Sequence, residues 1–278
     1  MTEHSGSRVE DVFAAARSDG RSVLVGYLPA GFPSYRGCVD AIRAMVDGGV
    51  DLVEVGLPYS DPVMDGPTVQ VAAQRALEGG LRTRDVLRTV ETVSPIVPTV
   101  VMTYWNPVER YGVDGFARDL AAAGGSGLII PDLIPDEAAE WTTTSDEHGL
   151  DRVFLVSPSS TQARIAMTVA ACRGFVYATS VMGVTGVREQ TSKRAPDLVA
   201  RVKEATALPV GVGLGVSNGD QAAEVAAYAD GVIVGSAFVR RLLDAGDDAL
   251  VGGAAVRALA EDLAGGVRRA TSGTPQGA

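Results

Sequence analysis

Residues 51–67 read DLVEVGLPYSDPVMDGP, a short apolar run that contains one glutamate and is followed by a proline-bounded loop. The run DLVEVG lacks the polar and apolar alternation of a sheet with one wet face. Continuous apolarity over such a short run is typical of a parallel strand covered on both sides. The stretch therefore predicts helices packed around the strand and further strands of the same kind.

Seven more runs of this kind occur along the chain. They are SVLVGYLPAG from Ser22, PTVVMTY from Pro98, GLIIPD from Gly127, RVFLVS from Arg152, FVYATS from Phe175, PVGVGLG from Pro209 and GVIVGSA from Gly231. Segments with helical periodicity lie between them, among them 35–49, 68–80, 113–125, 135–149, 161–174, 197–205 and 219–229, and many close with glycine. Eight strands that alternate with helices predict an α/β fold, a single (β/α)8 TIM barrel, rather than a doubly wound open sheet.

The ends of the chain differ from this repeating pattern. Residues 1–20 include an amphipathic segment, VEDVFAAARS, which we expect to form an additional N-terminal helix that closes the bottom of the barrel. Residues 21–268 contain no linker or low-complexity boundary and are expected to form the barrel, and residues 269–278 are expected to be a frayed tail. In such a barrel, catalytic groups lie at the C-terminal ends of the strands.

Composition indicates a soluble globular protein. The chain has 278 residues, of which 46% are hydrophobic and 21% are charged. It has neither a run of about 18 apolar residues nor a secretory signal, so we expect no membrane association and a cytoplasmic location. Cys38 and Cys172 lie far apart in sequence and form neither a disulfide framework nor a metal-ligand spacing, which indicates reduced, buried thiols.

Several kinds of chemistry are disfavoured by what the sequence offers. Its only histidines are His4 and His148, which lie in an expected tail and at an expected helix end, so neither a histidine triad nor a metal site is expected. The net charge of −10 disfavours nucleic acid as a partner. Schiff-base chemistry needs a lysine in the pocket, but Lys193 and Lys203 fall in a loop and a helix.

Glu54 lies near the C-terminal end of its predicted strand. Because side chains alternate along a strand, it points the same way as Leu52. An ionised carboxylate in the barrel interior costs several kcal/mol unless partners compensate it, so the expected result is a raised pKa, which suits an acid–base group at neutral pH. A second interpretation, in which Glu54 only binds backbone amides and does no chemistry, remains open.

Asp65 follows in the loop after this strand, between Pro62 and the pair Gly66 and Pro67. The prolines limit the freedom of the backbone around it. Asp65 is a candidate for a second functional carboxylate, but it is equally a candidate for a turn residue or an N-cap of the helix that starts near Thr68. Asp61 is an even better turn candidate.

The last two predicted strands end in glycine-rich segments. Gly211, Gly213 and Gly215 alternate at the end of the seventh strand, and Gly235 and Ser236 end the eighth. Barrels of this type often bind phosphate there, because backbone N–H groups and a helix dipole meet the anion. Alternatively, the only function of these glycines is to let helices pack closely. The polar run 188–194 that follows Gly186 is either a solvated connection or a lid.

Together these motifs resemble the tryptophan synthase alpha chain family over nearly the whole chain. LVEVGLPYSDPVMDGPTVQ resembles the family signature of the second strand and its loop, GVTG resembles the loop after the sixth strand, and GLGVSN with GSAFV resembles the phosphate site. The resemblance implies catalytic roles for Glu54 and Asp65 and places Tyr177 beside the reacting carbons. It implies phosphate-binding positions at Gly186, Gly215, Gly235 and Ser236, a substrate pocket lined by Tyr27, Tyr104, Ile129 and Thr185, and support of the catalytic loop by Asp132.

This resemblance also implies an activity. Family members perform the retro-aldol cleavage of indole-3-glycerol phosphate to indole and glyceraldehyde 3-phosphate, without a cofactor or metal of their own. They work with a beta chain that carries pyridoxal phosphate, in an α2β2 heterotetramer. Position 27 is commonly phenylalanine in the family, so the hydroxyl of Tyr27 is a departure that affects the shape of the indole pocket.

Other functions remain open at this stage. They are a different barrel enzyme for a phosphorylated substrate, a stand-alone indole-3-glycerol-phosphate lyase that needs no partner, and a non-catalytic regulatory subunit. The absence of lysine from the strand ends disfavours the first. The two carboxylates disfavour the last, because binding an uncharged indole gains nothing from buried acids.

Overall fold

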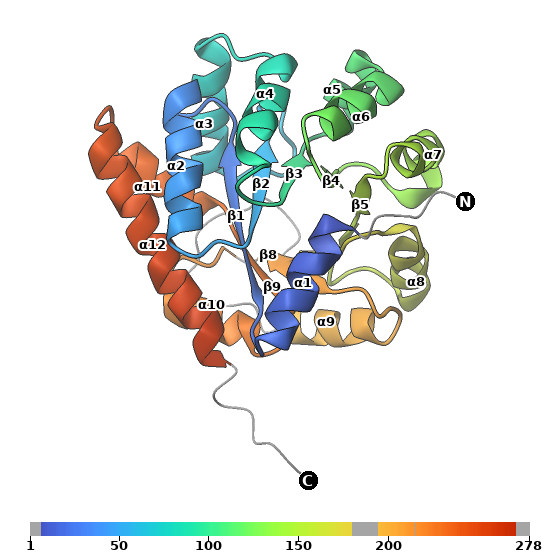
Figure 1. Ribbon diagram of the computed structural model, residues 1–278. Coiled ribbons are helices and arrows are strands. Elements are labelled where there is room, and N and C mark those ends of the chain that lie inside the picture. The colour runs from blue at the N-terminus through green and yellow to red at the C-terminus, as the bar shows by residue number, and fades with distance from the viewer. Residues whose placement is uncertain (1–6, 180–193, 214, 271–278) are drawn as a thin grey trace.

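A ring of short parallel strands forms the centre of the molecule, and helices surround it (Figure 1). The computed structural model describes residues 7–179, 194–213 and 215–270. The strands are β1 Val23–Pro29, β2 Leu52–Gly56, β3 Thr99–Met102, β4 Gly127–Ile129, β5 Asp151–Val153, β6 Leu155–Val156, β7 Val176–Thr179, β8 Val210–Gly213 and β9 Gly231–Val234. Their order is β5-β4-β3-β2-β1-β9-β8-β7-β6, and all the pairs are parallel.

The eight predicted strands are confirmed, but one of them is interrupted. The run from Arg152 forms two short strands separated by Phe154 alone, β5 and β6, which pair with β4 and β7 respectively. The carbonyl oxygen of Phe154 accepts a hydrogen bond from the backbone N–H of Tyr177 at 3.2 Å. The continuous segment 151–156 therefore pairs with β4 through its first strand and with β7 through its second. This nearly closes the ring of strands. The expected (β/α)8 barrel is confirmed.

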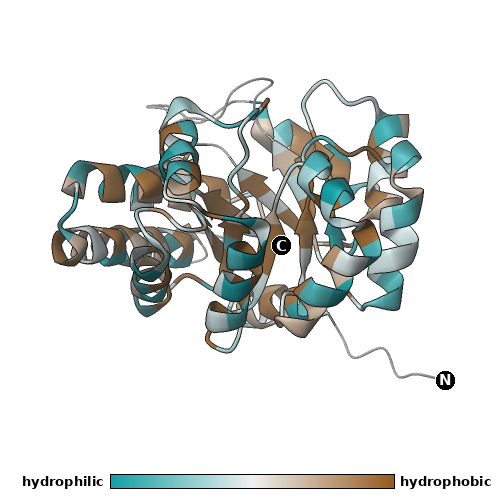
Figure 2. Cartoon of the chain, turned by 90° about the horizontal axis from the view of Figure 1, so that it is seen from above, coloured by the Kyte–Doolittle hydropathy of each residue, from teal (hydrophilic) through white to brown (hydrophobic). Residues whose placement is uncertain are grey.

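The helices fill the segments between strands. They are α1 Arg8–Ser18, α2 Tyr35–Asp47, α3 Pro67–Glu78, α4 Thr83–Val93, α5 Trp105–Tyr111, α6 Val113–Ala122, α7 Ala139–Glu147, α8 Gln162–Ala171, α9 Ala195–Lys203, α10 Gly219–Ala226, α11 Ser236–Ala245 and α12 Ala249–Arg269, with a 3-10 turn η1 at Pro135–Glu137. Apolar residues gather on the strands and on the sides of the helices that face them (Figure 2). Within the described ranges, no helix is long and apolar enough to cross a membrane.

The helix α2 shows how the local sequence produces these elements. Ser34 caps it by accepting a hydrogen bond from the backbone N–H of Gly37 at 3.0 Å. Its buried residues, Cys38, Val39, Ala41, Ile42 and Met45, recur at helical spacing and form one apolar stripe toward the barrel. The chain leaves the helix through Gly48 and then Gly49, whose φ of 106° favours glycine.

The longest helix, α12, was not among the helices that the sequence pattern indicated. It packs against α2, α10 and α11. A Cβ atom on Gly266 would lie 2.0 Å from the carbonyl oxygen of Gly219, and one on Gly48 would lie 2.5 Å from the Cβ atom of Ala260. Gly266 of α12 and Gly48 at the end of α2 therefore allow α12 to lie very close to the backbones of its neighbours.

The helix α1 packs on the apolar interior of the barrel. Val9, Phe13 and Ala16 are buried in one cluster with residues of β1, β2, β3, β4, β5 and β9. The ring of Phe13 lies 5.5 Å from that of Phe175, measured between centroids. The hydroxyl of Ser7, the residue that caps α1, donates a hydrogen bond to the carboxylate of Asp151. The helix thus closes one end of the interior and leaves the opposite end, where the strands finish, for a site.

We expect Phe13→Ala to destabilise the protein by about 3 to 5 kcal/mol, because the change removes a buried ring and leaves a cavity at the closed end of the barrel. Urea unfolding measures this cost. Arg17→Ala, on the exposed side of the same helix, is the control and should change stability by no more than about 0.5 kcal/mol. Similar small losses of stability in both variants would show that α1 contributes little to the packing of the barrel interior.

Candidate active site

Glu54 lies on β2 inside the barrel and is 1% exposed. In the strand register it stands between Tyr27 on β1 and Val100 on β3. Its Oε1 atom is buried and has no hydrogen-bond partner among the described residues. Burial raises the pKa of this carboxyl to about 8, because ionisation would place a charge where water cannot solvate it.

Asp65 lies in the loop of residues 57–66, which joins β2 to α3 and which we call the Asp65 loop. Gln70 on α3 donates a side-chain hydrogen bond to the backbone carbonyl of Asp65 at 2.8 Å. Burial raises the pKa of the Asp65 carboxyl to about 6, and a hydrogen bond from the Tyr104 hydroxyl opposes that rise. The N-cap of α3 is Gly66, with no capping side chain from the described residues, so Asp65 does not cap this helix.

Tyr104 connects the Asp65 loop to the next strand of the barrel. It is 5% exposed and directly precedes α5, and its hydroxyl accepts a hydrogen bond from the backbone N–H of Met64 at 3.0 Å. The same hydroxyl contacts the carboxylate of Asp65. Asp132, which follows β4, accepts a hydrogen bond from the backbone N–H of Trp105 at 2.9 Å. The start of α5, and with it Tyr104, is therefore held from the β4 side.

Two further tyrosines lie close to the carboxyl groups of Glu54 and Asp65. Tyr27 is 9% exposed, and burial together with the negative charges of Asp65 and Glu54 raises the pKa of its phenol well above the usual value. Tyr177 on β7 is partly buried, and burial and the charge of Glu54 likewise raise the pKa of its phenol. Glu54, Asp65, Tyr27, Tyr104 and Tyr177 thus form one cluster at the C-terminal ends of the strands.

Glycines make room for these phenols. A Cβ atom on Gly56 would lie 2.4 Å from the hydroxyl oxygen of Tyr27, and one on Gly213 would lie 2.3 Å from that of Tyr177. No side chain can occupy either position without displacing a ring. These two glycines are therefore part of the site, although they offer it no chemical group.

The other side of the opening is formed by the ends of β8 and β9. Gly215 has a φ of 70°, which favours glycine, and Gly235 is the N-cap of α11. Ser236 is the first residue of α11, and no side chain of the described residues caps this helix at Gly235. The first backbone N–H groups of such a helix lack intrahelical acceptors, so they are available to an anion.

Not every predicted site residue lies in this cluster. Ile129 is fully buried in the interior cluster that also contains Val9 and Phe13 of α1, and Tyr177 packs against this cluster. Thr185 and Gly186 lie outside the described residues. His148 contacts Asp114 at 2.9 Å, and Lys203 contacts Asp230 at 3.2 Å, so both side chains already face carboxylates outside the cluster. Over the described ranges, no group of three or more metal-ligating side chains comes together.

Two contacts of the site escaped the sequence analysis. The ring of Tyr59 lies 5.3 Å from that of Tyr104, although Tyr59 stands within the stretch 51–67 itself. Arg240 on α11 donates a hydrogen bond to the hydroxyl of Thr68 on α3 at 2.9 Å. No local pattern predicts a contact between residues so far apart in the chain.

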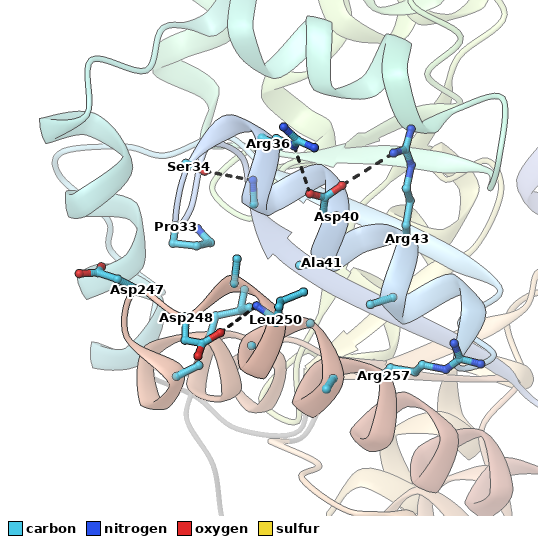
Figure 3. Close-up of a pocket in the computed structure, with 18 of the residues that line it drawn as sticks. Pro33, Ser34, Arg36, Asp40, Ala41, Arg43, Asp247, Asp248, Leu250 and Arg257 are labelled. Carbon is cyan, nitrogen blue, oxygen red and sulfur yellow. Dashed lines mark hydrogen bonds and ion pairs between the residues drawn. The ribbon is translucent and has the colours of Figure 1, made fainter.

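A separate hollow lies on the outer surface, between α2 and the junction of α11 with α12 (Figure 3). Arg36 and Arg43 lie 3.7 and 3.8 Å from the carboxylate of Asp40, and Arg257 lies 3.9 Å from that of Asp47. The three arginines of the hollow thus already face carboxylates of the protein.

Known proteins resemble this chain over almost its whole length. The family described as "Tryptophan synthase alpha chain" matches residues 13–268. The tryptophan synthase alpha chain of Acidothermus cellulolyticus is 63% identical over 262 residues, which cover 94% of this chain and 97% of that protein. That of Mycobacterium marinum is 59% identical over 273 residues, which cover 98% and 99%. A solved structure of Mycobacterium tuberculosis tryptophan synthase has a TM-score of 0.89 and 57% identity and covers 95% of this chain and 99% of that one.

The fold is a (β/α)8 barrel with two buried carboxyl groups of raised pKa at the C-terminal ends of its strands, which is where enzymes of this fold carry their active sites. The matches make the class more specific. The chain belongs to the tryptophan synthase alpha chain family. It is a lyase that cleaves indole-3-glycerol phosphate in tryptophan biosynthesis.

The raised pKa of Glu54 makes a prediction about stability. The folded protein keeps this proton up to about pH 8, whereas the unfolded chain releases it near the ordinary value of 4.5. Stability should therefore fall as the pH rises between these two values. We expect Glu54→Gln, which cannot ionise, to be more stable than the parent protein by roughly 2 to 4 kcal/mol at pH 9 and to show little difference at pH 4.5.

Urea unfolding of both proteins across this pH range provides the test. Other titrating groups are common to both proteins, so the difference between the two curves isolates Glu54. Parallel curves would mean that Glu54 ionises normally in the folded protein.

Proposed function

We propose that Glu54 and Asp65 are the two catalytic carboxyl groups of the retro-aldol reaction, which converts indole-3-glycerol phosphate to indole and glyceraldehyde 3-phosphate. The observation that carries the proposal is the state of Glu54, which has a buried oxygen without a partner among the described residues and a pKa near 8. A carboxyl in this state is protonated at neutral pH and has a free oxygen with which to meet a substrate.

Glu54 moves the protons of the reaction. In its acid form it protonates C3 of the indole ring, which makes the ring a leaving group. The carboxylate that results accepts the proton of the substrate hydroxyl next to the breaking bond. That hydroxyl becomes the aldehyde carbonyl, and the electrons of the broken carbon–carbon bond return to the ring. One carboxyl therefore gives and regains one proton in each cycle.

Asp65 stabilises the charge that appears during this sequence. Protonation at C3 places positive charge on the ring nitrogen, and an ionised carboxylate beside the N–H group favours that state. With a pKa of about 6, Asp65 is mostly ionised at neutral pH. The Tyr104 hydroxyl, which contacts both Asp65 and the backbone of Met64, holds the carboxylate in place.

The remaining predicted residues bind and position the substrate. Tyr177 lies beside the reacting carbons, and the indole pocket is lined by Tyr27, Tyr104, Ile129 and Thr185. Gly186, Gly215, Gly235 and Ser236 bind the phosphate. Asp132 supports the Asp65 loop through its hydrogen bond to the start of α5. The phosphate site and the carboxyl cluster thus bind opposite ends of one substrate.

The reaction as proposed consists of proton transfers, so this chain uses no cofactor or metal of its own. We further propose that it works with a tryptophan synthase beta chain, which carries pyridoxal phosphate, in a cytoplasmic α2β2 heterotetramer. Val63 in the Asp65 loop and Ile134 after β4 are exposed apolar residues near the mouth of the barrel and are candidates for the contact. Residues 1–20, 21–268 and 269–278 would form the closing helix, the barrel and the tail.

Glu54→Gln tests the acid–base role. The variant keeps the size of the side chain but cannot exchange the proton, so we expect turnover to fall by roughly 10² to 10⁴-fold. Indole release from indole-3-glycerol phosphate, with and without a beta chain, measures turnover, and binding of a substrate analogue without the reacting hydroxyl should persist. Turnover within tenfold of the parent protein would rule out this role for Glu54.

Asp65→Asn tests the electrostatic role. Loss of the charge should lower turnover about a hundredfold, and it should leave the melting temperature unchanged or raise it, because burial has raised the pKa of Asp65 and its ionised form costs stability at neutral pH. Asp61→Asn is the matched control, because Asp61 is exposed in the same loop and accepts a hydrogen bond from Ser60 only 2.5 Å away. If Asp65→Asn lowers the melting temperature but not turnover, Asp65 is a turn residue.

A further inference from the structure

A hydrogen bond connects the two helices that flank the opposite ends of the candidate site. The Arg240 guanidinium donates through Nη2 to the Thr68 hydroxyl at 2.9 Å, across 172 positions of sequence. Thr68 is 9% exposed, so its hydroxyl is held in a largely buried position. The helices α11 and α3 pack side by side along this contact (Figure 1).

On α11, the contact is tied to the phosphate end of the site. Ser236 is the first residue of α11, and Arg240 follows four residues later. Residues four apart lie on the same face of a helix, one turn above each other. The backbone N–H of Val239 donates to the carbonyl oxygen of Gly235 at 3.2 Å, so the first turn of α11 is already ordered. A shift of this turn caused by a bound phosphate would reach Arg240 directly.

On α3, the contact is tied to Asp65. Thr68 lies in the first turn of α3, two residues after the N-cap Gly66. The backbone N–H of Gln70 donates to the carbonyl oxygen of Gly66 at 2.9 Å, and its side chain donates to that of Asp65 at 2.8 Å. The first turn of α3 and the end of the Asp65 loop thus form one hydrogen-bonded unit, which the Arg240 side chain holds from outside.

We propose that Arg240 is a positioning residue that couples phosphate binding at the start of α11 to the placement of Asp65. This proposal rests on the proposed roles of Asp65, Gly235 and Ser236. Arg240 acts through Thr68 and the first turn of α3 and does not touch the reacting atoms. Tyr104 holds the Asp65 loop from the β3 side, so the Arg240 contact supplies the second support, from the α11 side.

Kinetics of four variants test the coupling. Arg240→Met removes the donor and Thr68→Val removes the acceptor at nearly constant volume. Both should lower kcat about threefold to tenfold, as expected for one partly exposed charge-assisted hydrogen bond, with KM changed less than about twofold. Thr68→Ser keeps the hydroxyl and should restore kcat, and Arg241→Met, at the exposed neighbouring position, should match the parent protein.

Three outcomes would overturn the coupling. The first is an unchanged kcat in both Arg240→Met and Thr68→Val. The second is a loss of kcat that Thr68→Ser does not restore. The third is a double variant with a lower kcat than either single variant. Two residues that share one hydrogen bond can lose its contribution only once. If Arg240→Met fails to fold, the comparison of Thr68→Val with Thr68→Ser provides the same test.

A binding experiment separates this proposal from the proposed function on which it rests. Glycerol 3-phosphate is the probe, with its affinity measured by calorimetry and hydrogen exchange measured in peptides that cover residues 57–66. In the parent protein the probe should bind and slow exchange in the Asp65 loop. In Arg240→Met it should bind with affinity within about twofold but slow exchange much less. Equal protection in both proteins, or none in either, would overturn the coupling, whereas failure to bind the parent protein would overturn the phosphate site itself.

Discussion

The desolvation of Glu54 is the constraint on which the rest of the site depends. A carboxyl is costly to bury, and Glu54 lies between strands in an interior that α1 seals from the far side. The helix α1 keeps water out of the interior at the end opposite the site. The pKa of Glu54 therefore rises, and the group keeps its proton at neutral pH. The closure of the barrel by Phe154 between β5 and β6 serves the same end, because a gap in the ring would admit solvent to the interior.

The two carboxyl groups differ in how firmly the fold holds them. Glu54 belongs to a strand paired on both sides, and its position is set by the register of the barrel. Asp65 belongs to a loop that depends on Tyr104, just before α5, and on Gln70 of α3, and α3 is itself bonded to Arg240 of α11 through Thr68. The rigid group is the one proposed to exchange protons, whereas the group proposed to supply charge is placed by contacts that a ligand can influence.

The sequence predicted the strands and the parts of the site that lie on them, because buried parallel strands are short apolar runs and their ends meet at one rim. The split at Phe154 was not predictable, since the run RVFLVS contains no glycine or proline that would mark a break. The helix α4 begins after Arg82, which lacks the usual capping signal, and the glycines of α12 hide its apolar stripe. Contacts such as Arg240 with Thr68 depend on which helices become neighbours. Thr185 and Gly186 remain predictions.

The close fit of phenol rings against glycines also constrains how this sequence can change over time. With Tyr27 in place, a methyl group at position 56 would overlap its hydroxyl, and the same holds for Tyr177 and position 213. A larger residue at either glycine is therefore compatible with this layer only if the ring shifts or a smaller side chain replaces it, so the residue allowed at one position depends on the residue present at the other.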